Sequence, residues 1–373
     1  MKLPPLSLYF HWPFCLSKCP YCDFNSHVRE KYDENSWKEA FFKSLDHEFL
    51  KHPDREIHSI FFGGGTPSLM SPALVTDILK KVASCWALPT EITLEANPNS
   101  VEVEKFKAFK EAGINRISIG IQSLNDDDLK FLGRTHSSEE ALKALEIGRS
   151  VFENWSFDLI YARPGQALKT WEEELKRALD LNPKHISLYQ LTIEPGTAFE
   201  KLHKRKQFIL PDEDLSADLY ELTREITQRY GFGDYEVSNY ALPGFESKHN
   251  LNYWRYGDYL GIGPGAHGRI TGKDGHKIAT KQFKAPETWI DAVNHHGNGY
   301  ETFDDLGGED MMMEKILMGI RLTEGVNIEG ANFRLSDINA IVSEGLASFE
   351  KFVLKLTPLG RLKTNAVLKY LFH

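Results

Sequence analysis

The sequence predicts an α/β protein: a partial (β/α)6 barrel followed by a smaller, winged-helix-like C-terminal α/β domain. Three observations lead to this fold class. Short apolar runs alternate with longer amphipathic segments through the first half of the chain, and this rhythm gives βαβ units and a parallel sheet. Glycine and polar residues follow most of these runs, where barrels carry their active sites. After about residue 210 the rhythm changes, which indicates a different architecture.

Six short apolar runs are predicted as the barrel strands, over residues 6–10, 59–64, 91–96, 116–121, 157–161 and 185–191. Five segments between them have helical length and periodicity, over 36–51, 72–86, 101–112, 138–151 and 168–181. Capping residues support two of these helices. Ser71 and Pro72 form an N-cap and first-turn pair, and Gly113 stands directly after the third helix.

The second half is predicted to contain a long helix over 212–230 and an aromatic, glycine-rich stretch over 235–268. From about residue 304 we expect a Met-rich helix over 311–321, a second helix over 336–344 and a wing-like run over 352–372. The mixed charge of this module favours a docking or lid role over DNA binding. The predicted domains are a barrel over 1–205, a barrel extension over 206–303 and a winged-helix-like domain over 304–373.

Composition limits the classes of protein that fit. A chain of 373 residues that is 41% hydrophobic can bury one large core and a smaller one. Its formal charge of −9 argues against nucleic acid as the main partner, because neutralising phosphates needs a basic face. The lysine-rich stretch 201–206 is predicted to be a solvated helix end or loop. Without a signal-peptide core or a run of about 18 apolar residues, we expect a soluble, cytoplasmic protein.

Three of the four cysteines, Cys15, Cys19 and Cys22, lie in one short segment with the spacing C-x3-C-x2-C. A structural zinc site normally has a second pair of ligands, which is missing here, although zinc or coincidence stays the alternative for the spacing alone. Three thiolates on a four-iron cluster leave one iron open to a small chelating molecule. Cys85 lies in an apolar helix and is predicted to be a small buried hydrophobe. Four cysteines, three of them within eight residues, are not a disulfide framework, so we expect a reducing compartment.

The residues around these cysteines, YFHWPFCLSKCPYCDFNS over 9–26, resemble the cluster loop of radical S-adenosylmethionine (SAM) proteins, specifically of their HemN/HemW branch. The resemblance implies that the three cysteines hold a 4Fe–4S cluster and that the amino and carboxylate groups of SAM chelate the open iron. It also implies that Tyr9 and Tyr21 lie at the cofactor, with Tyr21 against the adenine.

The sequence GGGTP over 63–67 cannot be a Walker loop, because the lysine of that motif is missing. Three glycines let the backbone approach a ligand, although a tight turn would use them too. The motif resembles the radical SAM loop that meets the methionyl amino group. This resemblance implies that Gly64, Gly65 and Thr66 contact SAM.

Four polar residues match HemN/HemW positions that contact SAM: Glu95, Gln122, Arg134 and Asp158. Carboxylates suit an ammonium group or a ribose diol, and arginine pairs with a carboxylate through two hydrogen bonds. The alternative is that polar residues at strand ends satisfy loop backbone. One departure lies nearby: this chain has ARPG over 162–165 where the family commonly has GLPG. We expect the turn to survive and Arg163 to face water.

The segment His249-Asn250-Leu-Asn-Tyr253-Trp254 resembles a motif tied to haem in HemW proteins. The resemblance implies that His249, Asn250, Tyr253 and Trp254 contact haem. His249 would be an axial ligand, and the aromatic faces would lie against the macrocycle. A hydrogen-bonded structural histidine is the alternative. Another family stretch, GIGPGAHG, follows over 261–268.

The resemblance leaves two functions of different classes. One is a HemW-type haem chaperone that binds haem, the cluster and SAM and hands haem to an acceptor such as a respiratory enzyme. Its partners would include a reductant such as flavodoxin or ferredoxin, with peripheral contact to membrane-bound acceptors. The other is an oxygen-independent coproporphyrinogen III dehydrogenase, a radical SAM decarboxylase of porphyrin biosynthesis. Phe24 stands where the dehydrogenases carry a fourth cysteine, and only 14 residues precede Cys15, which favours the chaperone.

Overall fold

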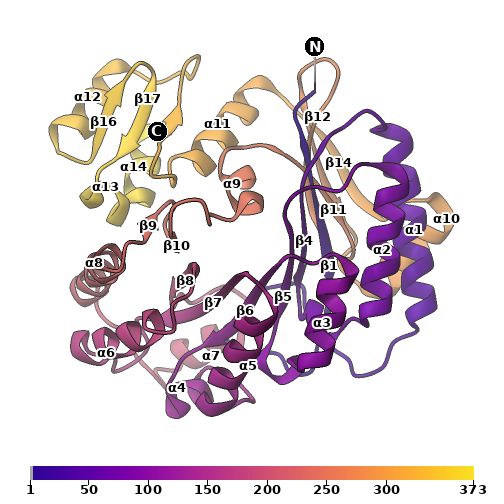
Figure 1. Ribbon diagram of the computed structural model, residues 1–373. Helices are drawn as coiled ribbons and strands as arrows, with labels where there is room; N and C mark the ends of the chain where they lie inside the picture. The colour runs from indigo at the N-terminus through magenta and orange to yellow at the C-terminus, as the bar shows by residue number, and fades with distance from the viewer. Residues whose placement is uncertain (1–2) are drawn as a thin grey trace.

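The computed structural model describes residues 3–373 and is dominated by one twelve-stranded sheet (Figure 1). Six strands of this sheet are parallel and lie side by side in chain order: β1 (Leu6–Trp12), β4 (Ile57–Gly64), β5 (Ile92–Ala96), β6 (Arg116–Gln122), β7 (Asn154–Tyr161) and β8 (His185–Gln190). The six predicted barrel strands are therefore confirmed. Their carboxyl ends meet at one rim.

The five predicted helices are present between these strands: α1 (Glu34–Lys51), α2 (Pro72–Cys85), α3 (Val103–Ala112), α5 (Ser138–Val151) and α6 (Leu168–Leu179). The predicted caps form as expected. Ser71 Oγ accepts a hydrogen bond from the Leu74 amide, and Gly113 ends α3 with φ at 116°. The helices α1 and α2 lie outside the sheet together with α10 (Pro286–His296), whose Trp289 stacks on Trp37 at 5.7 Å (Figure 1).

Several helices were not predicted, among them α4 (Asp126–Phe131), α7 (Ala198–Lys204) and two 3-10 turns over Pro67–Leu69 and Pro98–Ser100. The basic stretch 201–206 forms the exposed end of α7, as expected. The predicted long helix is α8 (Glu213–Arg229).

A seventh parallel strand, β11 (Asp258–Ile262), pairs with β1 on the side opposite β4. Beyond it lie three antiparallel strands: β12 (His267–Thr271), β13 (Lys277–Gln282) and β14 (Tyr300–Leu306). At the other end of the sheet, β10 (Asn239–Ala241) and β9 (Gly233–Asp234) follow β8. The edge strands β14 and β9 are not paired with each other, so the barrel is open. The helix α9 (Lys248–Trp254) lies near this opening (Figure 1).

The C-terminal unit, residues 308–373, has its own apolar core and its own sheet of β15 (Val326–Asn327), β17 (Val353–Leu356) and β16 (Ala347–Glu350). Its helices are α11 (Gly308–Gly319), α12 (Leu335–Ser343), α13 (Pro358–Leu362) and α14 (Thr364–Leu371). This is the predicted α/β module with one correction. The run 352–372 is a strand only as far as Leu356, because Thr357 caps a new helix at Pro358.

The predicted boundary at 303/304 falls inside β14, and the predicted barrel and extension both supply strands to the large sheet. Beneath the cluster loop, Trp12 and Phe14 pack edge to face at 5.3 Å between ring centroids, and Phe14 meets Trp37 at 5.3 Å. These buried rings anchor the start of the loop. No helix in residues 3–373 is long and apolar enough to span a membrane.

Candidate functional site

A cavity of about 340 Å³ lies at the carboxyl-end rim of the parallel strands. It is lined by every residue that the sequence predicted for the cluster and for SAM except Tyr9. These residues are Cys15, Cys19, Tyr21, Cys22, Gly64, Gly65, Thr66, Glu95, Gln122, Arg134 and Asp158. Residues from the cluster loop and from the ends of β4 to β7 therefore converge on one space.

Each of the three cysteine sulfurs in this first cavity has a polar neighbour. Thr66 Oγ1 donates to Cys15 Sγ at 3.4 Å, Arg134 Nη1 donates to Cys19 Sγ at 3.3 Å, and the Ser26 hydroxyl lies 3.9 Å from Cys22 Sγ. Burial raises the pKa of Cys15 and Cys22. These polar groups would stabilise thiolates once a metal centre removes the protons.

Among the residues that line this cavity, these three are the only cysteines, and there is no histidine. The lining therefore lacks the fourth cysteine or histidine of a closed structural zinc site, whereas three thiolates suit a four-iron cluster with one open iron. Cys85 does not line the cavity and is packed, partly buried, against the main core, as predicted.

The glycine loop brings backbone against both the cysteines and the carboxylates. The Gly64 amide donates to Glu95 Oε2 at 3.2 Å, and Gly64 has φ at 112°. A Cβ on Gly65 would lie 2.7 Å from the Phe14 carbonyl oxygen and 3.0 Å from Cys15 Sγ. Only glycine fits this approach without moving the cluster loop.

Two neighbouring carboxyl groups, Glu95 and Asp158, form the floor of the first cavity. Burial, and then the charge of Asp158, raise the pKa of Glu95 to about 8. Burial raises the pKa of Asp158 to about 6, although Ser118 donates to it at 3.4 Å. A cation placed against the pair would favour their ionised forms, so the floor suits an ammonium group.

Two further polar residues complete the rim. Arg134 Nη2 donates to the Gly120 carbonyl at 2.7 Å, whereas its buried Nε has no hydrogen-bond partner among residues 3–373. A carboxylate from a ligand would satisfy that donor. Gln122 takes φ at 72° where the β6–β7 register shifts, and local strain of this kind is common at ligand sites.

A second cavity of about 480 Å³ adjoins the first and shares Phe24, Glu95 and Asp158 with it. Tyr9, His249, Asn250 and Tyr253 line this second cavity. Aromatic rings make up much of its wall.

Trp254 lines neither cavity and instead has its ring 6.0 Å from the guanidinium carbon of Arg321 in the C-terminal unit. The haem motif is thus divided, with three of its residues at the second cavity and one at the junction between the two units.

His249 is 1% exposed and has both ring nitrogens engaged. Its Nδ1 lies 2.7 Å from Ser59 Oγ, and its Nε2 lies 2.7 Å from the Tyr253 hydroxyl. Burial lowers the pKa of His249 to about 3, so the ring is neutral. The ring also stacks on Phe61 at 4.9 Å. In this arrangement His249 holds Tyr253 at the cavity wall.

The prediction that Arg163 faces water is wrong. Its side chain is 3% exposed and forms ion pairs with Glu174 and, at 3.2 Å, with Asp128. Ser123 accepts a further hydrogen bond from Arg163 at 2.7 Å. Arg163 lines neither cavity, so it ties the turn after β7 to α6 instead. The turn itself survives as predicted, with Ala162 at φ 56°.

Several lining residues were not predicted: Tyr189 in both cavities, and His11, His185, His267 and Met318 in the second. His267 follows β11, whose carboxyl end lies at the same rim as that of β1. Functional residues of such barrels follow the carboxyl ends of the parallel strands. This rule would have pointed to His267 if β11 had been predicted.

Comparison with known proteins identifies the family of the chain. A family model described as the radical SAM superfamily matches residues 9–178. The chain is 40% identical over 328 residues to "Heme chaperone HemW" of Escherichia coli K12, covering 87% of this chain and 84% of that one. It is 44% identical over 297 residues to the protein of that name from Haemophilus influenzae, with coverages of 78% and 76%. It is also 40% identical over 326 residues to mouse "Radical S-adenosyl methionine domain-containing protein 1, mitochondrial", with coverages of 86% and 74%.

Among solved structures, coproporphyrinogen III oxidase HemN of Escherichia coli matches with a TM-score of 0.83 and 21% identity, covering 99% of this chain and 90% of that one. This likeness concerns the fold alone. The cysteine loop, the glycine loop, the strand-end residues and the sequence relatives agree with one another. The chain belongs to the HemW family of the radical SAM superfamily.

Proposed function

We propose that this protein is a haem chaperone that holds a 4Fe–4S cluster and SAM in the first cavity and haem in the second, and passes haem to an acceptor protein. The observation that carries the proposal is the pair of adjoining cavities with a common wall at Phe24, Glu95 and Asp158. Relatives 35% to 44% identical to the chain are named haem chaperones.

The residues of the first cavity fit the cluster and SAM. Cys15, Cys19 and Cys22 would hold three irons, and the unpartnered Arg134 Nε would donate a hydrogen bond to the methionyl carboxylate. Glu95 and the glycine loop would take the amino group. When bound, the cluster and SAM supply one-electron reducing chemistry. The chain supplies the positions of these groups and the polar contacts that favour thiolates.

The second cavity suits a flat, largely apolar ligand with charged edges. Its volume of about 480 Å³ is typical of sites for small molecules and cofactors. Tyr9, Phe61, Tyr253 and Tyr259 present aromatic surface to it. Rings of this kind stack on a macrocycle and keep water from it. Met318 of α11 contributes to the wall, so the C-terminal unit helps to enclose the ligand.

The proposal includes partners and a location. A reductant such as flavodoxin or ferredoxin would dock over the cluster loop, whose outer face exposes Leu16 (49%) and Val28 (60%) beside Lys18. The acceptor would be a haem protein such as a respiratory enzyme, reached by peripheral contact where it is membrane-bound. Cysteines that hold a cluster must stay reduced, and Cys15, Cys19 and Cys22 form no disulfide among the described residues, which supports a reducing compartment such as the cytoplasm.

Coproporphyrinogen III dehydrogenase is the less favoured alternative. Similarity to HemN at 21% identity concerns the fold. Phe24 stands at the position where, by the family resemblance, those dehydrogenases carry a fourth cysteine. A phenylalanine ring cannot take part in proton or electron transfer as a thiol does.

One anaerobic experiment separates the two functions. Purified, reconstituted protein is titrated with haem by absorbance and, separately, incubated with coproporphyrinogen III, SAM and a reductant. We expect a Soret band on haem addition and unchanged porphyrinogen by product analysis. Multiple-turnover decarboxylation without haem binding would replace the chaperone with the dehydrogenase.

A further inference from the structure

Four histidines line the second cavity, and they differ in whether a ring nitrogen is free. His11 has its Nδ1 3.0 Å from the Tyr9 hydroxyl and its Nε2 2.9 Å from the Asn25 carbonyl oxygen. Both ring nitrogens of His249 are also engaged, by the hydroxyl groups of Ser59 and Tyr253. His185 has its Nε2 2.8 Å from the Tyr235 hydroxyl, and its Nδ1 has no hydrogen-bond partner among residues 3–373, but that nitrogen is buried and the residue is 1% exposed. Binding of iron to His11 or His249 would break a buried hydrogen bond.

His267 is the exception. Its side chain is exposed to the cavity, and neither ring nitrogen has a hydrogen-bond partner within residues 3–373. Among the described histidines of this cavity, His267 is therefore the one with an unengaged ring nitrogen on an exposed side chain, so it can bind a metal without losing an existing contact.

The backbone, rather than the side chain, fixes the position of His267. Its neighbour Ala266 accepts a hydrogen bond from the Gln282 amide at 2.8 Å, and the Gly265 amide donates to the Phe283 carbonyl at 2.8 Å. His267 also pairs with Lys281 in the β12–β13 ladder. A rigid backbone with an uncommitted imidazole is the arrangement expected of a preorganised ligand.

The charges around His267 suit an anionic ligand. Burial lowers the pKa of His267, and the positive charges of Arg269, Lys281 and Lys284 lower it further. The negative charge of Glu301 opposes this effect. The imidazole is therefore neutral near pH 7, the form that binds iron. Lys281 pairs with Glu301, whereas Lys284 is exposed and forms no ion pair among the described residues. Haem propionates would find a free cation there.

We infer that His267 supplies the imidazole that ligates haem iron in the second cavity, with His249 acting as a positioning residue for Tyr253. The inference rests on the proposed haem-binding function and names its iron ligand. Arg269, Lys281 and Lys284 place cationic groups near the same side chain.

The test is a haem titration of the full-length protein and of three variants, followed by absorbance and electron paramagnetic resonance. His267→Ala should weaken haem affinity at least tenfold and shift the Soret band, and added imidazole should restore the wild-type band. His249→Ala should weaken binding without changing the iron spin state. His276→Ala is the matched control, because this exposed histidine lies before β13 of the same hairpin and lines neither cavity. It should behave as wild type.

The outcomes separate the inference from the proposed function. Wild-type protein without a Soret band would remove the chaperone function itself. A wild-type band that His267→Ala leaves unchanged in position and affinity would overturn the inference alone. Loss of the native spin state in His249→Ala would assign the ligand to His249. His267→Gln, which keeps much of the side-chain volume, replaces the alanine variant if far-UV circular dichroism shows that variant unfolded.

Discussion

Single side chains decide whether the first cavity holds iron. The three clustered cysteines each have a polar neighbour, whereas Cys85 packs against the core. Replacing Cys15, Cys19 or Cys22 with alanine should remove the broad visible absorption and the bound iron, because each change deletes one of three ligands. Absorbance and an iron assay after anaerobic reconstitution measure this. Cys85→Ser should keep both signals. A Cys85→Ser protein without bound iron would contradict the ligand assignment.

Glu95 makes stability depend on pH. Its folded pKa of about 8 lies above its ordinary value of 4.5, so the folded chain holds a proton that the unfolded chain releases. The contribution of Glu95 to stability is therefore complete below about pH 4.5 and is lost as the pH rises through about 8. Glu95→Gln should remove this loss, so its stability relative to wild type should rise above about pH 4.5 and exceed that of wild type by on the order of 5 kcal/mol near pH 8.

Urea unfolding of the cluster-free protein at several pH values measures the effect. The exposed helix residue Glu139, changed to glutamine, is the control and should leave the wild-type pH profile intact. Parallel profiles for wild type and Glu95→Gln would show that Glu95 does not hold the proton.

Arg163 shows what a local sequence pattern lacks. Its partners Glu174 and Asp128 are distant in sequence, and only the packed fold brings them together. Arg163→Met should destabilise the protein by about 3–5 kcal/mol, because it leaves a buried carboxylate without its partner. Denaturant unfolding measures this. Arg177→Met, on the exposed side of α6, is the control. Adding Glu174→Leu to Arg163→Met should recover part of the loss, and a further loss instead would contradict the ion-pair explanation.

At the scale of elements, the glycine loop and the cluster loop act as one piece. A methyl group on Gly65 would lie within 3.0 Å of three atoms of the cysteine loop. Gly65→Ala should therefore lower bound iron after reconstitution several-fold while the far-UV circular dichroism stays native. Gly308→Ala is the control, because a Cβ there meets nothing within 4 Å. A Gly65→Ala protein with full iron content would show that the loops move independently.

The sequence predicted elements with strong patterns and missed those that depend on neighbours. The six strands from β1 to β8 are apolar runs between helices, so their periodicity identified them. The strand β11 is a five-residue segment in a glycine- and tyrosine-rich stretch, and its pairing with β1 gives it its conformation. Missing β11 removed the signal for His267. The second cavity could not be predicted from the sequence either, because its wall includes Met318 of α11, which is distant along the chain.

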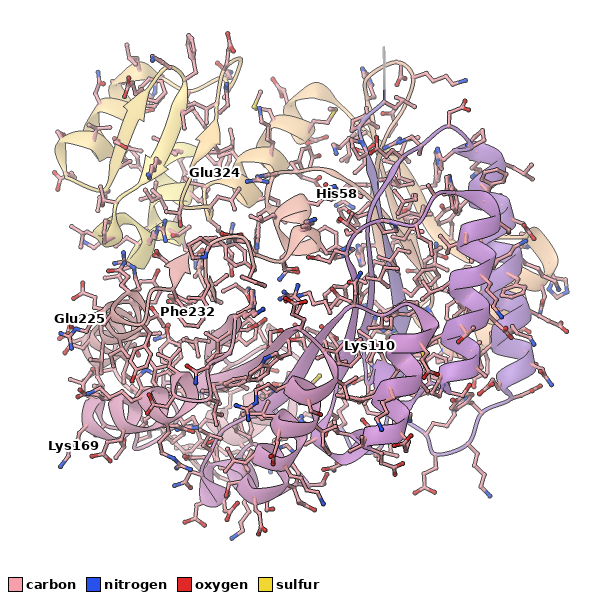
Figure 2. All side chains as sticks on the ribbon, viewed as in Figure 1. His58, Lys110, Lys169, Glu225, Phe232 and Glu324 are labelled. Atoms are coloured by element: carbon pink, nitrogen blue, oxygen red, sulfur yellow. The ribbon has the colours of Figure 1, made fainter. Side chains whose placement is uncertain are left out.

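At the scale of the whole molecule, charged contacts attach the C-terminal unit to the barrel. Glu314 of α11 accepts from Arg269 at 2.7 and 2.8 Å, and Glu324 pairs with Arg255 at 2.7 Å. Arg361 reaches Asp234 at 2.8 Å. Figure 2 shows Glu324 at the junction of the two units. The Arg269–Glu314 and Arg255–Glu324 pairs are partly exposed. Salt should therefore weaken these two pairs more than the buried Arg361–Asp234 pair.

Raising the salt concentration from about 0.05 to 0.5 M should speed amide hydrogen exchange in α9 and α11 but not in the central strands. Mass spectrometry after deuterium labelling measures this. Glu314→Gln should have the same effect at low salt. Asp337→Asn is the control, because Asp337 pairs with Arg334 inside the C-terminal unit. Equal exchange at both salt concentrations would mean that apolar contacts attach the unit.

The common wall of the two cavities makes their ligands thermodynamically dependent on each other. Glu95 and Asp158 face both spaces, so a cation that ionises them from one side changes the field that a ligand meets on the other. Free-energy coupling of this kind is reciprocal: the factor by which SAM alters the affinity for haem is the factor by which haem alters the affinity for SAM. Occupancy of one chamber is thereby expected to change the affinity of the other for its ligand.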